Sequence, residues 1–280
     1  MEIDNPLLSH IRQPTASLNL SSGGKFWPDG AIDKFENIEV YPMTGQDELL
    51  LLNTKGVLLG SVLAEVISNC IPAIKDVWSI PKIDVDSIII AIRCASYNNT
   101  MNVEYVCESC ETGQKHSVDL IEVSKEIAVP DYEMPLTFDD LSIWFRPATF
   151  KENYQQMVDQ NSKLTVMKNL ARDDLTDDEK QELAKNSLVE VTKINIAALA
   201  NSIDRVLISN GVTVTNKAHI QEWLLSLNRA NYLLVTEAIN NKNNEYQLPK
   251  RSFTCKNSEC GHITELTIDF NPADFLSNGD

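Results

Sequence analysis

Four of the six cysteines in this sequence fall into two close pairs, and their spacing is suited to metal binding. Cys107 and Cys110 form a C-x2-C pair, whereas Cys255 and Cys260 form a C-x4-C pair. Each pair lies between two short segments with strand-like patterns, and a glycine follows each pair closely. Two tight turns of this kind can aim four thiolates at one point, as a tetrahedral structural zinc site requires. The sequence therefore predicts structural zinc bound by these four cysteines.

The arrangement of the two pairs leaves three possibilities open. One shared zinc ion requires the parts of the chain that carry the pairs to pack together, and the ion would then join two units of the protein. Alternatively, each pair forms its own site, completed by His116 and His262 or by a neighbouring chain. The third possibility is that no metal binds, so that the thiols are free or Cys107 and Cys110 form a redox pair. A thioredoxin-like role is disfavoured, because a C-x-x-C of that type begins a helix and this one lies between strands.

No other set of residues has the spacing of a catalytic site. Cys70 and Cys94 lie among isoleucines and alanines in predicted helices, where small apolar core residues are expected. The sequence has no phosphate-binding, dinucleotide-binding, zinc-protease or nucleophile-elbow motif, and its four histidines have no recognisable acid–base context. Paired acids such as Asp139 and Asp140 are better explained as solvated residues near helix starts than as catalytic carboxylates. We therefore expect that the protein is not an enzyme.

Composition and charge limit the function further. The 280-residue chain has 40 acidic and 24 basic residues, which gives a net charge of −16. Without a basic patch, such a chain repels nucleic-acid phosphates, so the acidity suits solubility or a basic protein partner instead. The N-terminal residues lack a secretory signal pattern, and no apolar run is long enough to span a membrane. We expect the protein to be made and kept in a cytosol, where cysteines bind metal more often than they form disulfides.

The pattern along the chain predicts an arm and two units. Residues 1–36 lack sustained periodicity and are expected to form an extended N-terminal arm with a few apolar anchors. A first unit is predicted over residues 37–129, with a strand, helices and a cysteine knuckle, which is the turn that carries a cysteine pair. Residues 130–141 contain two prolines and are interpreted as a linker. A second, larger helical unit that ends in the second cysteine knuckle is predicted over residues 142–280.

In the first unit, the expected order is strand, helices and then two strands around the first cysteine pair. A strand is predicted at Ile38–Tyr41, and Thr44 then opens a helix in a capping box with Asp47. A second helix is expected at about 60–71. Asp84 is assigned as the cap of a third helix, whose isoleucines recur at helical spacing.

The second unit is predicted to be mostly helical. It opens on a strand at Ile143–Arg146. Asn210 and Gly211, flanked by β-branched residues, indicate a two-residue hairpin turn. Helices are expected at about 218–227 and 230–239, before strands on either side of the second cysteine pair.

The openings of the two units can be aligned with each other. Each has alternating apolar residues, a proline (Pro42 or Pro147), and then a threonine (Thr44 or Thr149) with an acid three residues further on. The alignment indicates either a diverged internal duplication or two ordinary strand-to-helix turns. The predicted class is α+β and mostly helical, with two related units that each have short strands and a cysteine knuckle.

A set of short segments in the N-terminal half is distinctive in combination. They are Leu18-x-Leu20-x-Ser22-x-Gly24 with Trp27-Pro28, Val40 to Glu48, the helix from Asp86 to Tyr97, and Val118-Asp119-Leu120 after the first cysteine pair. In these segments the chain resembles the phage T4-type baseplate hub subunit family, over roughly residues 15–125. The resemblance implies a part in building the baseplate hub, as a stable component or as an assembly factor. It implies no catalytic motif, and the zinc prediction depends on cysteine spacing alone.

The preferred hypothesis is a non-enzymatic structural or assembly component of the baseplate hub of a contractile phage tail, acting by protein–protein contacts. Its partners would be other baseplate or tail proteins. It would lie in the host cytoplasm during assembly and in the tail baseplate of the virion. The second hypothesis is a tail-assembly chaperone that binds a tape-measure or hub protein. The third is a zinc-ribbon nucleic-acid-binding protein, which the net charge of −16 disfavours.

Overall fold

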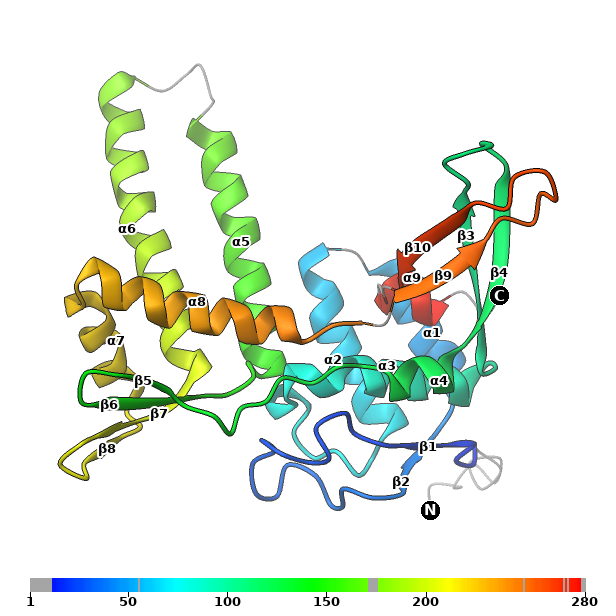
Figure 1. Ribbon diagram of the computed structural model, residues 1–280, viewed down its shortest axis with the longest axis horizontal. Helices are drawn as coiled ribbons and strands as arrows, with labels where there is room; N and C mark the ends of the chain where they lie inside the picture. The colour runs from blue at the N-terminus through cyan, green and yellow to red at the C-terminus, as the bar shows by residue number, and fades with distance from the viewer. Residues whose placement is uncertain are drawn as a thin grey trace, which may run out of the picture. The chain divides into compact units, whose positions relative to one another are not determined.

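The chain folds as an α+β protein in which small antiparallel sheets accompany a larger number of helical residues, as predicted. The computed structural model describes residues 12–54, 56–170, 176–248, 250–268, 270 and 272–277. Two compact units are present (Figure 1): unit 1 comprises Met1–Ala128 and Gln247–Asp280, and unit 2 comprises Val129–Tyr246. Among the described residues, none of the helices combines the length and apolar character needed to cross a membrane.

The described residues of unit 1 form three two-stranded antiparallel sheets and a group of helices. In chain order its elements are β1 (Ala16–Leu18), β2 (Ile38–Val40), α1 (Gly45–Asn53), the short 3-10 helix η2 (Gly56–Leu58), α2 (Leu59–Cys70), the 3-10 helix η3 (Val77–Ser79), α3 (Lys82–Ser96), β3 (Thr100–Val106), β4 (Gly113–Asp119), α4 (Leu120–Lys125), β9 (Lys250–Thr254), β10 (Ile263–Thr267) and α9 (Pro272–Ser277). The sheets pair β1 with β2, β3 with β4, and β9 with β10.

Helix α3 is the central element of unit 1. Its isoleucines at 88, 89 and 92 are at most 1% exposed, and β1, β2, α2, α4 and α9 all pack against it. The apolar positions therefore cover most of the helix circumference, which is the pattern of a helix surrounded by other elements.

The start of α3 differs from the prediction. Asp84 does not cap the helix, because α3 begins at Lys82 after Pro81 and its first residues have no side-chain cap. The Asp84 carboxylate is fully buried and instead accepts hydrogen bonds from the N–H and hydroxyl of Ser22, at 2.7 and 2.6 Å, and from the indole N–H of Trp27 at 2.8 Å. Burial raises the pKa of this carboxyl, and these hydrogen bonds oppose that shift.

The predicted N-terminal arm is thereby held on unit 1 from Arg12 onwards. Leu18 and Trp27 are buried, and β1 pairs with β2. Gly24 has a φ of +86°, and a Cβ at this position would lie 2.5 Å from the ring of Phe35. Only glycine fits both the backbone and the space there. Residues 1–11 of the predicted arm lie outside the described residues.

Both predicted threonine caps are present. The Thr44 side chain accepts from the N–H of Asp47, whose carboxylate accepts from the Thr44 N–H, so the capping box of α1 is confirmed. Thr149 and Glu152 form the same reciprocal pair at the start of α5 (Phe150–Leu170) in unit 2. Each box satisfies two backbone amides that the helix itself leaves unpaired.

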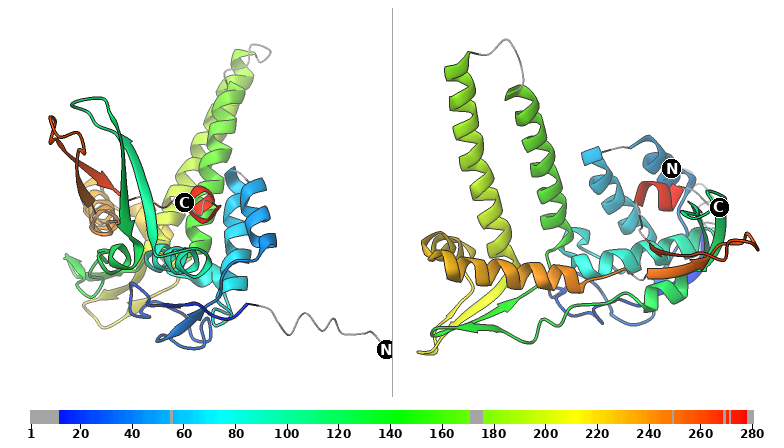
Figure 2. Two further views of the ribbon diagram at one scale, coloured as in Figure 1. Left: turned by 90° about the vertical axis from the view of Figure 1, so that its right-hand side faces the viewer. Right: turned by 45° about the horizontal axis from the view of Figure 1, so that its top comes forward.

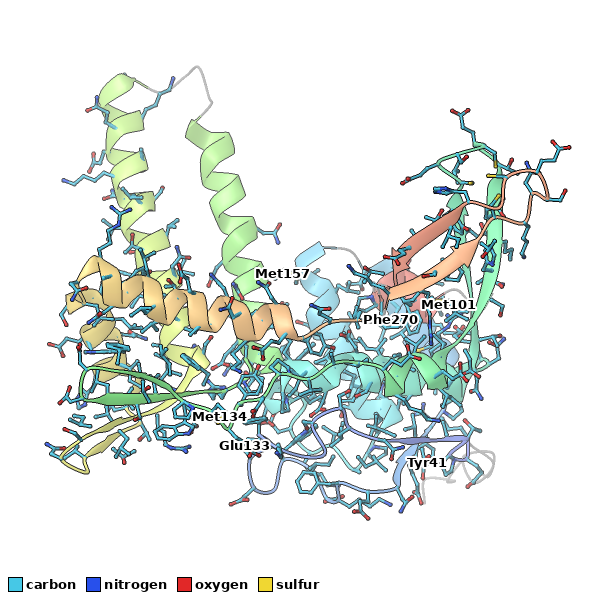
Figure 3. All side chains as sticks on the ribbon, viewed as in Figure 1. Tyr41, Met101, Glu133, Met134, Met157 and Phe270 are labelled. Atoms are coloured by element: carbon cyan, nitrogen blue, oxygen red, sulfur yellow. The ribbon has the colours of Figure 1, made fainter. Side chains whose placement is uncertain are left out.

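The C-terminal helix α9 is fixed to unit 1 by a buried arginine. Arg93 of α3, which is 1% exposed, donates to the carbonyl of Phe275, and its guanidinium lies 4.9 Å from the centre of the Phe275 ring. Phe270, labelled in Figure 3, packs edge-on against Phe275 with ring centres 4.7 Å apart. The hydroxyl of Tyr97 donates to the carbonyl of Leu276. A buried guanidinium surrounded by aromatic rings and a carbonyl keeps the end of the chain against α3.

Unit 2 consists of one four-stranded antiparallel sheet and four helices among the described residues. Its elements are β5 (Leu136–Phe138), β6 (Leu141–Phe145), α5, α6 (Asp177–Ser202), β7 (Ile203–Ile208), β8 (Thr213–Val214), α7 (Lys217–Ser226) and α8 (Arg229–Glu245), with strand order β5-β6-β7-β8. The predicted hairpin is present between β7 and β8, but its turn is one residue longer than predicted. Leu207 pairs with Thr213 and the N–H of Ile208 donates to the carbonyl of Val212, so residues 209–211 form the turn, in which Gly211 has a φ of +90°. Helices α5 and α6 run side by side as an antiparallel hairpin (Figure 2).

The boundaries of the two units differ from the predicted ones. Residues 136–141, assigned to the linker, contribute β5 and the start of β6. Residues 247–280, assigned to the second unit, belong to unit 1. The reason is a bridge at the base of unit 2, where Ala128 and Gln247 exchange backbone hydrogen bonds of 3.1 and 3.4 Å. Unit 2 is therefore an insertion whose two connections leave unit 1 at adjacent points.

The role of Asp84 can be tested by Asp84→Ala. This change removes the acceptor of three buried donors, so the free energy of local opening of residues 20–30 should fall by about 3 kcal/mol. Hydrogen–deuterium exchange measured by mass spectrometry reports this segment separately from unit 2. The matched control is Asp33→Ala in the same arm, which removes an exposed 2.7 Å ion pair with Lys75 and should change the opening free energy by about 0.5 kcal/mol or less. Equal exchange in the two variants would contradict the role assigned to Asp84.

Candidate metal centre

The four cysteines of the two pairs meet at one point in unit 1. All four sulfur atoms of Cys107, Cys110, Cys255 and Cys260 lie within 4.8 Å of one another. The first cysteine of each pair approaches the second cysteine of the other. Cys107 Sγ lies 3.9 Å from Cys260 Sγ, and Cys110 Sγ lies 3.6 Å from Cys255 Sγ.

Two hairpin turns of similar design position these thiols. In the first, the N–H of Cys107 donates to the carbonyl of Thr112 at 3.0 Å, and in the second, the N–H of Cys255 donates to the carbonyl of His262 at 2.8 Å. The residue directly after each pair has a positive φ, 54° at Glu111 and 57° at Gly261. The left-handed residue reverses the chain, so both thiols of a pair point to the same side of the turn. The wider C-x4-C spacing makes the second turn longer, but the two thiols of that turn have the same orientation as those of the first.

The arrangement fits a tetrahedral metal ion. A zinc–sulfur distance of about 2.3 Å in a tetrahedron places the sulfur atoms about 3.8 Å apart. The two measured contacts of 3.9 and 3.6 Å lie on either side of that value. Four thiolates are soft donors that select zinc, copper(I) or iron over magnesium or calcium. The four cysteines therefore fit a metal ion, with all four sulfur atoms within 4.8 Å of one another.

Electrostatics in the cluster favour a cation. Hydrogen bonds with the hydroxyl and the backbone of Thr112 lower the pKa of the Cys110 thiol to about 6. At Cys255 a backbone hydrogen bond at Asn257 favours the thiolate, but burial and hydrogen bonds with the other three thiols outweigh it and raise the pKa to about 12. Without a cation, burial and the neighbouring thiols therefore disfavour the thiolate at Cys255. A divalent ion would displace the thiol protons and neutralise the thiolates.

A small core between the two hairpins holds the turns together. His116 stacks against Tyr105 and lies 5.0 Å from the ring of Phe253, measured between ring centres. The sequence leaves His116 and His262 as possible ligands that complete separate sites. Among the described residues, the cluster of potential ligands comprises the four cysteines and neither histidine. His116 fills the core between the hairpins, and His262 contributes its backbone carbonyl to the second turn.

Gln114 is a residue of this site that the sequence did not indicate. It is 5% exposed, and its side-chain oxygen accepts a 2.8 Å hydrogen bond from the backbone N–H of Lys256, directly after Cys255. The side chain of Lys256 in turn donates to the carbonyl of Lys115. Gln114 thus aligns the second turn on the first. The only sequence signal for this role is a glutamine directly after the turn glycine. Its inward-facing position on β4 can be recognised only when the strand register is known.

The two knuckles lie in the same unit. The sequence placed one knuckle in each of two units, so a shared ion would have joined those units. In the structure both hairpins belong to unit 1, because the chain returns from unit 2 at Gln247 before β9 begins. A bound ion would therefore join the C-terminal segment of unit 1 to its N-terminal part. The other two thiols are separate from the cluster: Cys70 is fully buried and Cys94 partly buried, and burial raises the pKa of each to about 11.

The fold and the site together define an α+β protein whose distant segments are held together by side-chain packing and by a cluster of four cysteines. Residues 13–277 match the model of the family described as T4 bacteriophage base plate protein. This match covers nearly the whole chain, so the chain belongs to that family. No curated protein and no solved structure matches it significantly. The protein is a structural component of a phage baseplate, which implies a location in the virion tail and other tail proteins as partners.

The metal centre can be tested by Cys255→Ser. The purified protein should contain one metal ion per chain, and this variant should contain none, because three thiolates bind a tetrahedral ion far more weakly than four. Elemental analysis measures the content. Limited proteolysis should then cut the variant near residue 250, since the C-terminal hairpin loses its attachment.

The matched control for this test is Cys94→Ser, which removes a thiol outside the cluster. It should keep the metal and resist the protease as the unchanged protein does. Two metal ions per chain would refute one shared site. No metal in the unchanged protein would reduce the four cysteines to ordinary thiols.

Proposed function

We propose that this protein is a non-enzymatic component of the hub region of the baseplate of a contractile tail, and that it acts by protein–protein contacts. The family match across residues 13–277 is the observation that carries the proposal. The hub assignment is favoured by the segments of the arm and first unit that resemble hub subunits. It would be present in the host cytoplasm during assembly and in the tail baseplate afterwards.

Zinc is the metal proposed for the four-cysteine cluster. Sulfur-only tetrahedral sites with closed coordination are typical of structural zinc. In a reducing cytosol the thiols stay available for the metal, and zinc does not undergo redox chemistry there. The ion would have no open position for a substrate, since all four ligands come from the protein. Its role in this proposal is to hold the returning C-terminal hairpin in place.

Absence of catalysis is part of the proposal. The two buried aspartates and the paired cysteines have structural roles: Asp84 holds the arm, Asp47 completes the capping box of α1, and the paired cysteines face one another. Asp47 also accepts from the amide of Asn69 at 2.8 Å. Buried polar groups that are fully occupied by internal hydrogen bonds are suited to fixing a fold and are not free to act on a substrate.

A second candidate is a tail-assembly chaperone that binds a tape-measure or hub protein. The observation that favours it is the hairpin of α5 and α6, where Leu188 is 68% exposed and Val189 is 47% exposed. Exposed apolar residues on a projecting helix suit transient binding to an incompletely assembled partner. The two candidates differ in the mature particle. A scaffold component is retained in purified virions, whereas a chaperone is found only in the infected-cell lysate, and mass spectrometry of both samples distinguishes them.

Loss of the gene should stop tail formation. An amber mutant should yield intact capsids and normal genome replication but no complete tails, because a missing baseplate component prevents the tube from starting. Electron microscopy of the lysate and measurement of replicated genome test this. Complete tails in the mutant lysate, or a replication defect, would refute the proposed function.

Nucleic acid should bind weakly at physiological salt. The net charge of −16 opposes the release of counterions that drives such binding. Fluorescence anisotropy with a labelled duplex and a labelled RNA should give dissociation constants above roughly the micromolar range typical of non-specific contacts. Sub-micromolar affinity would revive the zinc-ribbon alternative.

A further inference from the structure

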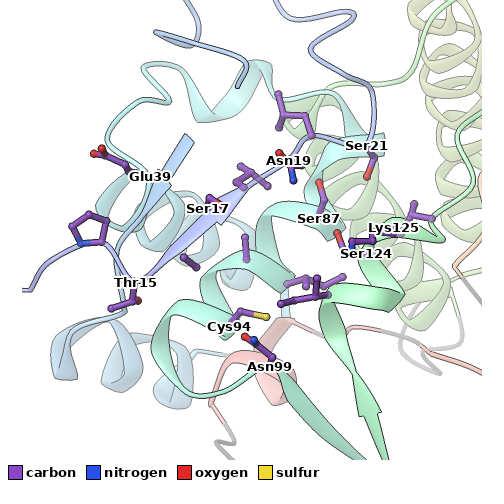
Figure 4. A pocket seen from close by; sticks show the side chains of 18 residues that line it. Thr15, Ser17, Asn19, Ser21, Glu39, Ser87, Cys94, Asn99, Ser124 and Lys125 are labelled. Atoms are coloured by element: carbon purple, nitrogen blue, oxygen red, sulfur yellow. The ribbon is translucent and has the colours of Figure 1, made fainter. Parts of the chain in front are cut away.

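Unit 1 contains a groove beside β1 that none of the described residues fills. Its volume is about 800 Å³. The extended run of residues 14–21, which includes β1, forms one side (Figure 4). Successive turns of α3 lie at its base, with Ser87 and Cys94 labelled in Figure 4, and Ser124 and Lys125 of α4 lie on the opposite side. All of these residues belong to unit 1.

The strand in this groove has an unpaired edge. Within the described chain, β1 forms a two-stranded sheet with β2 alone, in the register Ser17 to Glu39. Backbone groups of alternate residues therefore point away from β2. An edge of this kind is a template for another strand, which proteins normally block with charges, prolines or a covering element. Here the position next to the edge is a groove.

The groove also has polar side chains along its length. Ser17, Asn19, Asn99 and Ser124 line it, and the hydroxyl oxygen of Ser21 is buried without a partner. Between them lie apolar surfaces from Ile90 and Ala91 of α3 and from Ile121 and Ile127 at α4. Polar groups spaced along an apolar channel match a polypeptide backbone, which offers donors and acceptors at every residue.

The charges at the two ends of the groove define the partner further. Lys125 is exposed and has no ion-pair partner in the part of the chain that the structure describes. It lies on the side where Ser21 ends the extended run, whereas Glu39 lies toward the side of Thr15 (Figure 4). A segment with an acid at one end and a base or neutral residue at the other is therefore complementary to the groove.

We propose that this groove binds an extended segment of another tail protein, roughly five to eight residues long, that adds a strand to the free edge of β1. An acidic side chain of that segment pairs with Lys125. Its small or apolar side chains face Ile90, Ala91 and Ile121. The proposal rests on the proposed baseplate function for the identity of the partner, and on the groove itself for its chemistry.

The test uses a photo-crosslinking residue inside the groove. p-Benzoylphenylalanine is introduced at position 124 of the full-length protein, which is supplied from a plasmid during infection with the amber mutant. The matched control carries it at position 122, on the same helix but outside the groove. Mass spectrometry then maps the crosslinked peptide. We expect position 124, and not position 122, to crosslink to one segment of another tail protein that contains an acid.

A second measurement uses the purified protein and a fluorescent peptide with the crosslinked sequence. The change Lys125→Glu should weaken its binding at least about tenfold, because a charge-assisted contact is replaced by repulsion. Ser124→Trp, which fills the groove, should abolish binding, whereas Glu122→Trp should leave it unchanged. Zinc content of each variant checks that unit 1 remains folded.

Two outcomes would overturn this proposal. One is a crosslink from position 124 to residues 1–11 of the same sequence, in the same or a second copy. The other is no crosslink that depends on position. Either result leaves the baseplate function intact, since that function fails if the amber mutant still forms complete tails or has a replication defect.

Discussion

Four thiols within 4.8 Å of one another are the strongest constraint on this structure. Thiolates at such distances repel one another, and burial together with the neighbouring thiols raises the pKa of Cys255 to about 12, although a backbone hydrogen bond at Asn257 opposes that shift. A cation resolves this conflict, and a tetrahedral ion needs the spacing that the turns already provide. The hairpins β3–β4 and β9–β10 are each only two strands, which are marginal alone. Their stability therefore depends on the shared core and on what the four sulfurs bind.

The same constraint explains how unit 1 tolerates a large insertion. The chain leaves unit 1 after Ala128 and returns to it at Gln247. The C-terminal segment must therefore pack against the N-terminal part of unit 1 again after unit 2 has been formed by the intervening residues. Three contacts hold it there at separate places: the backbone bridge at the base of unit 2, the cysteine cluster, and Arg93 with α9. The N-terminal arm is held in a comparable way by Asp84. Unit 1 is thus closed by buried polar and charged contacts at its ends, around the apolar helix α3.

A fold closed in this way suits a component that must keep its shape within an assembly. Membership of the baseplate family agrees with it, since such proteins act through their surfaces. The described surface offers two distinct kinds of contact. Helix α6 presents the exposed Leu188 and Val189, and the groove presents the edge of β1 that pairs with no described strand, together with the unpartnered hydroxyl of Ser21. A helical face and a strand edge are distinct modes of protein recognition.

The sequence alone determined the features that depend on neighbouring residues. The capping boxes at Thr44 and Thr149, the hairpin at Gly211 and the apolar spacing of α3 are set within a turn or two of chain, where propensity and local hydrogen bonds dominate. The two cysteine pairs also carry their chemistry in their spacing. What the tertiary structure decided is which distant segments meet. Asp84 has the sequence context of a helix cap, but the buried arm supplies better donors. The second knuckle meets Gln114 and the first knuckle only because the bridge at Gln247 returns the chain to unit 1, and no local pattern encodes that return.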